Sequence, residues 1–294
     1  MLPQKLAYES MGTTWEISIW DQIKEDAFTS ITSEITHKSH EFDNTYSRFI
    51  KNSFVSKISH KTGKIKVPEE FIQILQLYFK LYDLSEKKLT PFIGHTLEEL
   101  GYDADYSLIS QKKINKVPDL FETVKIIDTT TIKVKEPVLF DFGAVGKGFL
   151  VDTATSFLKE KGVKRFLVNG SGDISYVSND KEITVGLENP LNTTQIIGTI
   201  KMKYGCMCSS ATNRRAWGKY NHIIYPQTLS SPKEIIASWV IADSAALADG
   251  LATALFMVPP ENFSINFQFE YCILNKDLQV KRSSGFHAQL FGKL

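Results

Sequence analysis

Alternation of apolar and polar residues is clearest near the start of the chain. Between residues 8 and 20, Trp15, Ile17 and Ile19 fall on one face, and threonine, glutamate and serine fall on the other. A period of two predicts a β-strand that buries one of its faces.

Four segments instead predict helices. A polar helix-like stretch runs to about residue 42, and apolar stripes with helical spacing cover residues 67–85, 147–162 and 244–258. Pro68 suits a first helical turn, Gly162 a helix end, and Pro259 a stop. Asp243 or Ser244 is expected to cap the last helix.

Most of the remaining apolar segments are short and strand-like. They include residues 183–187, 195–203, 205–211, 221–226 and 237–242, and a hairpin is expected around Asn275–Asp277. Runs of strands between few helices indicate an α+β fold with mixed or antiparallel sheets and flanking helices. The length of 294 residues fits one large domain, residues 1–294, built as two intimate lobes.

Composition narrows the function classes. The formal net charge is +1 and no basic tract stands out, which argues against nucleic acid as a partner. No apolar run reaches the length of a membrane span. The first ten residues lack the apolar core of a signal peptide, so a cytoplasmic protein is expected, with an exported form as the alternative if a leader was removed. Three cysteines fit a reducing compartment.

The stretch DFGAVGKGF, residues 141–149, combines Asp141, three glycines and Lys147. Glycines let the backbone approach a ligand, and a lysine beside such a turn suggests a phosphate. The spacing matches neither a Walker loop nor a dinucleotide fingerprint. The alternative is an ordinary turn into a helix, with one solvated lysine.

Two further residues suggest chemistry. Asp249 and Thr253 stand four apart on one face of the last helix, where a carboxylate, a hydroxyl and a backbone carbonyl would make a sparse oxygen site that suits Mg²⁺. The alternative is that Asp249 is a surface aspartate or caps a neighbouring element. His222 precedes an apolar pair, and a lone strand histidine is usually a packed one. It gains a catalytic interpretation only if it shares a cleft with Lys147 and Asp249.

Several motifs, in order, resemble the FAD:protein FMN transferase family, also called ApbE or flavin-trafficking proteins. They cover nearly the whole chain: MGTTWEISIW, DNTYSRFIKNSFVSKIS, LTPFIG, ELGYD, DFGAVGKGFLVD, VNGSGDI, NHIIYPQT and ADGLATALF. Each motif is weak alone, and their shared order carries the resemblance.

The resemblance implies an ApbE-like fold that binds FAD in a cleft between two lobes. It implies Mg²⁺-dependent transfer of FMN from FAD to a threonine or serine hydroxyl of a flavoprotein acceptor, with release of AMP. The alternatives are an FAD pyrophosphatase, which yields FMN and AMP, and a non-catalytic flavin-binding protein. Mn²⁺ is the alternative metal.

Carried over by position, the resemblance implies roles for particular residues. The metal ligands would be the Ala144 carbonyl, Asp249 and Thr253. His222 would be the catalytic histidine, with Asp249 also catalytic. The residues in contact with FAD would be Met11, Tyr46, Leu89, Thr90, Asp141, Lys147 and His222.

The chain departs from the family pattern around this site. Tyr225 stands in place of an aspartate, Leu229 in place of a glycine, Leu89–Thr90 in place of Phe-Asp, and Ala252 in place of a serine. A histidine that titrates near neutral pH predicts activity that rises with pH through the histidine range.

Overall fold

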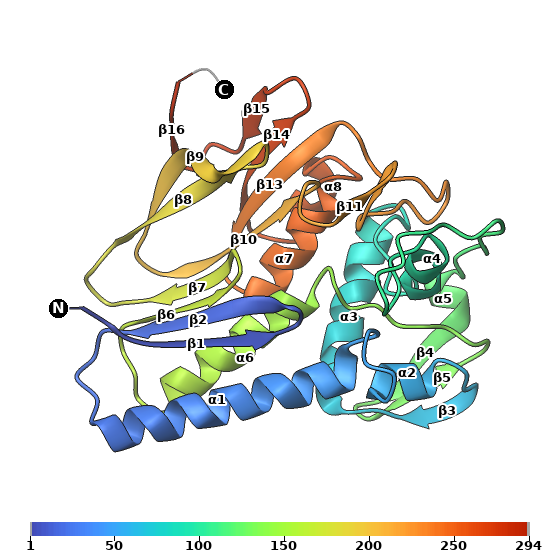
Figure 1. The fold of residues 1–294 in the computed structure, drawn as a ribbon, viewed down its shortest axis with the longest axis horizontal. Helices are drawn as coiled ribbons and strands as arrows, with labels where there is room; N and C mark the ends of the chain where they lie inside the picture. Colours follow the sequence, from blue (N-terminus) through green and yellow to red (C-terminus); the bar gives the residue numbers. More distant parts are fainter. Residues whose placement is uncertain (1, 293–294) are drawn as a thin grey trace.

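A central antiparallel sheet of eight strands organises the computed structural model, which describes residues 2–292 (Figure 1). In spatial order its strands are β1 (Gln4–Ser10), β2 (Thr13–Ile19), β6 (Phe166–Gly170), β7 (Asp173–Val177), β10 (Gly205–Ala211), β13 (Ile235–Ala242), β14 (Glu270–Asn275) and β15 (Val280–Arg282). Each neighbouring pair is antiparallel.

Three small sheets accompany it. Their strands are β8 (Ile183–Asn189), β9 (Asn192–Met202) and β16 (Gln289–Leu290); β3 (Gly63–Lys66), β5 (Thr131–Val134) and β4 (Val124–Asp128); and the pair β11 (Ala216–Trp217) and β12 (Tyr220–Asn221). Apolar side chains of β8 and β9 pack with Ile174, Met207 and Trp239, so their sheet covers one face of the central sheet.

Helices cover the other face and fill the space beside it (Figure 1). They are α1 (Glu25–Tyr46), α2 (Phe54–Ile58), α3 (Glu69–Leu84), α4 (Gly94–Glu99), α5 (Leu120–Thr123), α6 (Gly146–Glu160), α7 (Ala245–Ala254) and α8 (Glu261–Ser264). Helices α6 and α7 contact the central sheet, and α1 and α3 pack against them in turn.

The α+β prediction is confirmed, as are the helices expected at the α3, α6 and α7 positions. The strand expected over residues 221–226 is wrong. After β12 the chain turns, because the Asn221 side chain accepts a hydrogen bond from the Ile223 N–H at 2.9 Å. Residues 138–140 are buried but lie outside the sheets, and α7 ends before the predicted residue 258.

No helix within residues 2–292 is both long enough and apolar enough to span a bilayer.

The first half of α6 is hydrogen-bonded to the first turn of α7. Asp152 on α6 accepts hydrogen bonds from the N–H groups of Ala245 and Ala246, at 2.8 and 2.9 Å, and thereby caps α7. Ser244 adds a cap on the Leu247 N–H at 3.3 Å, as the sequence predicts. The start of α6 therefore has a fixed position relative to α7.

Gly148 allows this close approach. A Cβ atom added at Gly148 would lie 2.1 Å from the Ala245 carbonyl oxygen, which belongs to rigid helix backbone. Two helices can meet at this distance only where one has no side chain.

We expect Gly148→Ala to lower the free energy of unfolding by about 1–3 kcal/mol, because the methyl group must push α6 away from α7. Denaturant unfolding measures the change. Ser156→Ala is the matched control, because Ser156 is exposed on the same helix and should shift stability by no more than about 0.5 kcal/mol. Equal stability of the two variants would contradict the packing argument.

Candidate active site

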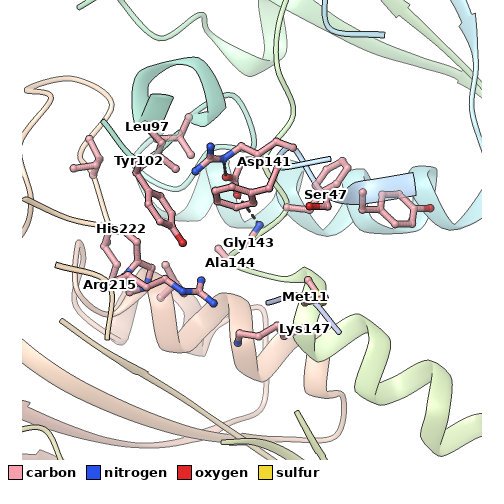
Figure 2. A pocket seen from close by; sticks show the side chains of 18 of the residues that line it. Met11, Ser47, Leu97, Tyr102, Asp141, Gly143, Ala144, Lys147, Arg215 and His222 are labelled. Carbon is pink, nitrogen blue, oxygen red and sulfur yellow. Dashed lines mark hydrogen bonds and ion pairs between the residues drawn. The ribbon is translucent and has the colours of Figure 1, made fainter. Parts of the chain in front are cut away.

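A cavity of about 340 Å³ opens where α1, α6, α7 and the loop after α3 meet (Figure 2). Nine of the ten residues singled out from the sequence line it. These are Met11, Tyr46, Leu89, Thr90, Asp141, Ala144, Lys147, His222 and Thr253. The tenth, Asp249, lies beside Lys147, to which it is ion-paired.

Lys147 stands in a buried cluster of charges. Its ammonium forms an ion pair with Asp173 on β7, and a second one with Asp249 on α7 at 3.5 Å. Both carboxylates are 1% exposed. Each carboxylate also accepts one backbone hydrogen bond: the Gly148 N–H donates to Asp249 at 3.0 Å, and the Ser209 N–H donates to Asp173 at 3.2 Å.

The cluster shifts the protonation of its members. Burial, followed by the charge of Asp173, raises the pKa of Asp249. Burial alone would lower the pKa of Lys147, but the two carboxylates outweigh it and raise that pKa. Lys147 is therefore an ammonium, and two carboxylates face one positive charge. The raised pKa of Asp249 means that its carboxyl group tends to keep a proton, and a further cation would offset its negative charge in place of that proton.

Oxygen atoms suited to that cation lie on the same side of α7. Gly148 lies in the first turn of α6, where backbone N–H groups have no acceptor within the helix, and its N–H donates to Asp249 instead. The Ala144 oxygen faces α7, 3.9 Å from the position of a Cβ at Gly250. One turn on, the Thr253 hydroxyl shares a hydrogen bond of 3.3 Å with Ser210.

This donor set fits a hard cation. A carboxylate, a hydroxyl and a backbone carbonyl are the oxygen ligands that Mg²⁺ accepts, with water or phosphate oxygens completing its shell. Within residues 2–292 no group of three or more His, Cys, Asp or Glu side chains is arranged to hold a metal. A cation here would therefore depend on ligand oxygens as well as on protein ones.

His222 is held by its backbone, and its side chain lines the cavity. Its N–H donates to the Arg215 carbonyl at 3.0 Å, and its buried Nδ1 has no hydrogen-bond partner among the described residues. Burial, with the charges of Arg215 and Lys147, lowers the pKa of His222 to about 3. The sequence-based expectation of a histidine that titrates near neutral pH is thus wrong. The ring is neutral because its surroundings are buried and cationic.

Asp141 forms an ion pair with Arg48, which is not among the residues expected from the sequence to form the site. Its carboxylate accepts hydrogen bonds from Arg48 Nε at 2.6 Å and from the Gly143 N–H at 2.7 Å. The guanidinium lies 4.1 Å from the ring centroid of Phe49 and 5.0 Å from that of Tyr102. Asp141 therefore positions the cavity wall and the turn before α6.

Aromatic rings line the part of the cavity near Arg48. Tyr106 stacks on Phe49 with centroids 5.5 Å apart and planes 8° apart, and Tyr102 stacks on Trp217 at 5.4 Å. Planar rings of this kind suit a planar ligand group, while the Lys147 cluster suits an anionic one. The cavity thus has an aromatic part and an ionic part.

Two residues that depart from the family pattern lie in one loop. Leu229 has a φ of 55°, the left-handed region that a glycine adopts without strain. The Tyr225 hydroxyl donates to the Phe256 carbonyl at 3.2 Å, at the end of the α7 segment. The loop therefore keeps a glycine-type backbone, and Tyr225 ties it to the segment that follows α7.

Comparison with known proteins finds relatives that match most of the chain. FAD:protein FMN transferase of Buchnera aphidicola subsp. Schizaphis graminum is 24% identical over 279 residues, 86% of this chain and 79% of that protein. The protein of that name from Vibrio cholerae is 22% identical over 277 residues, 87% and 81% of the two chains.

Solved structures share the fold. The ApbE protein of Thermotoga maritima superposes with a TM-score of 0.85 at 21% identity, covering 97% of this chain and 98% of that one. The flavin transferase ApbE of Vibrio cholerae gives a TM-score of 0.76 at 19% identity, with 97% and 98% covered. A sequence model of the ApbE family matches residues 11–267, and the chain belongs to this family.

Proposed function

We propose that the protein transfers FMN from FAD to a threonine or serine hydroxyl of a flavoprotein, with release of AMP, in a reaction that requires Mg²⁺ or Mn²⁺. The observation that carries the proposal is the buried cluster in which one ammonium, Lys147, faces two acidic side chains, Asp173 and Asp249, beside a neutral His222. Relatives that bear the name FAD:protein FMN transferase support it.

The reaction balances as a substitution at phosphorus. The acceptor oxygen bonds to the phosphorus of the FMN half, the bond from that phosphorus to the oxygen of AMP breaks, and AMP leaves with the electron pair. The hydroxyl proton goes to a base. His222, unprotonated and with an unpartnered Nδ1, is the residue suited to accept it.

The other residues bind and orient. The Ala144 carbonyl, Asp249 and Thr253 would hold the cation, and Lys147 would keep the two buried carboxylates in place while it faces the pyrophosphate. The cation, when bound, would neutralise phosphate charge and favour the departure of AMP. We assign Met11, Tyr46, Leu89, Thr90 and Asp141 to the walls of the FAD cleft, between two lobes of a single domain.

Incubation with FAD, Mg²⁺ and a candidate flavoprotein domain, followed by intact-mass analysis, tests the proposal. An added FMN on the acceptor supports it. Free FMN and AMP without the adduct indicate a pyrophosphatase, in which water replaces the hydroxyl. FAD that stays intact with several acceptors, and with either metal, contradicts both reactions and leaves a flavin-binding protein.

We expect Asp249→Asn to abolish Mg²⁺-dependent turnover, because the amide keeps the shape but lacks the charge that a hard cation needs. The metal-free fold should be no less stable, since the change also removes repulsion between two buried carboxylates. Turnover against Mg²⁺ concentration and thermal unfolding measure the two effects. Asp243→Asn, at the exposed start of the same helix, is the control. Full activity of Asp249→Asn at low Mg²⁺ would remove Asp249 from the site.

Lys147→Met should lower the free energy of unfolding by about 3–5 kcal/mol at pH 8, because it leaves buried carboxylates without a counter-charge. The loss should shrink towards pH 5. When the pKa of a carboxyl group is raised above its ordinary 3.8 in the folded protein, the free energy of unfolding falls as the pH rises. At lower pH the group is protonated and neutral, so its burial costs less. Denaturant unfolding at both values measures this.

The double variant Lys147→Met/Asp249→Asn should recover part of the lost stability, because it removes one of the two unpaired charges. A Lys147→Met protein as stable as the wild type would show that the lysine is not the counter-charge of the cluster.

His222 yields a prediction about pH. With a pKa of about 3, the imidazole of the free enzyme is already unprotonated at pH 5, so kcat/KM should show no histidine step between pH 5 and 8. His222→Ala should lower kcat by roughly a hundredfold, the scale for loss of a general base. FAD affinity should stay nearly unchanged. A step near pH 6.5 that vanishes in His222→Ala would show a solvated histidine in the working enzyme.

A further inference from the structure

Arg215 is a cation of the cavity that none of the site assignments above includes. It lies in the loop between β10 and β11, and its side chain is half-buried and lines the cavity. Figure 2 shows the guanidinium extending into the cavity towards Lys147, with His222 and Tyr102 beside it. The hydrogen bond from the His222 N–H to the Arg215 carbonyl holds the two backbones together.

The neighbouring arginine makes a useful contrast. Arg214 is exposed and forms an ion pair with Glu188, outside the cavity. Arg215 has no carboxylate partner within residues 2–292. The positive charge of Arg215 acts on the site, because it helps to lower the pKa of His222. A guanidinium that points into a cavity without a counter-ion is suited to an anionic ligand.

The charges of the site show what that ligand needs. With both carboxylates ionised, the cluster of Lys147, Asp173 and Asp249 carries one negative charge by itself. Arg215, which pairs with neither carboxylate, adds one positive charge to the cavity. A bound divalent cation would then leave the site with two positive charges, equal and opposite to the two negative charges of a dinucleotide pyrophosphate. Without Arg215 the site would be one positive charge short.

We propose that Arg215 is a catalytic residue whose guanidinium binds a non-bridging oxygen of the phosphate that is transferred. The inference rests on the proposed function. Arg215 exchanges no proton and forms no covalent bond. It stabilises negative charge on the phosphoryl oxygens while the acceptor oxygen bonds to phosphorus and AMP departs. Its planar fork can hold two oxygens at fixed geometry, which a lysine cannot do.

Four variants test the role. Arg215→Gln should lower kcat by roughly a hundredfold, the scale for loss of one donor to a developing charge. Arg215→Lys should fall between Arg215→Gln and the wild type, because it keeps the charge and loses the fork. Arg214→Gln is the matched control and should behave as wild type. Guanidinium ion added to Arg215→Ala should restore part of the rate, which a purely structural arginine would not allow.

Binding separates this inference from the proposed function. Flavin fluorescence gives the affinities for FAD and for riboflavin, which has the same ring system but no phosphate. Arg215→Gln should weaken FAD binding and leave riboflavin binding unchanged. If the wild type neither transfers nor hydrolyses, the proposed function fails, while a phosphate-selective loss of affinity still supports the phosphate contact of Arg215.

Two results would overturn the inference. One is an Arg215→Gln protein that turns over and binds FAD like Arg214→Gln. The other is an Arg215→Gln protein that loses FAD and riboflavin affinity equally, because that pattern shows a distorted cavity instead of a missing phosphate contact.

Discussion

The ion cluster of Lys147, Asp173 and Asp249 is the interaction on which the site depends. It joins the start of α6, the start of β7 and the middle of α7, three elements that are far apart in the sequence. Burying two carboxylates is costly unless they are paired and hydrogen-bonded, and each receives the Lys147 ammonium and one backbone N–H. The absent side chain at Gly148 lets the two helices approach closely enough for this pairing.

Sequence periodicity predicted the elements that carry the site but not the contacts between them. The stripe of α7 and the glycine-rich start of α6 follow from local rules, so both helices were found. Lys147 and Asp249 are 102 residues apart, and Arg48 is 93 residues from Asp141. Such pairs are created by packing, so Asp173 and Arg48, the partners of Lys147 and Asp141, carried no local signal strong enough to name them. The same holds for Arg215, which packing brings into the cavity. The motifs VNGSGDI and DNTYSRF did contain two of the three.

The one misassigned segment of the site has a local cause. Apolar residues around Ile223 and Ile224 suggested a strand, but the Asn221 side chain takes over a backbone hydrogen bond and turns the chain. The same loop then holds Leu229 in a left-handed conformation that costs a residue with a side chain roughly 1–2 kcal/mol. Tyr225 anchors the loop to the carbonyl of Phe256. Packing of the loop therefore holds Leu229 in a backbone conformation that a glycine at this position would adopt without strain.

The cations and the histidine of this site are coupled. Under the proposed assignments Lys147 and Arg215 would both face a bound phosphate, and their charges help to lower the pKa of His222. The cations that would bind phosphate would then also keep the proposed base, His222, unprotonated before substrate binds. When a pyrophosphate neutralises those cations, their effect on the imidazole weakens and its affinity for a proton rises. The histidine would accordingly become a better proton acceptor at the stage when substrate is bound and the acceptor hydroxyl must lose its proton.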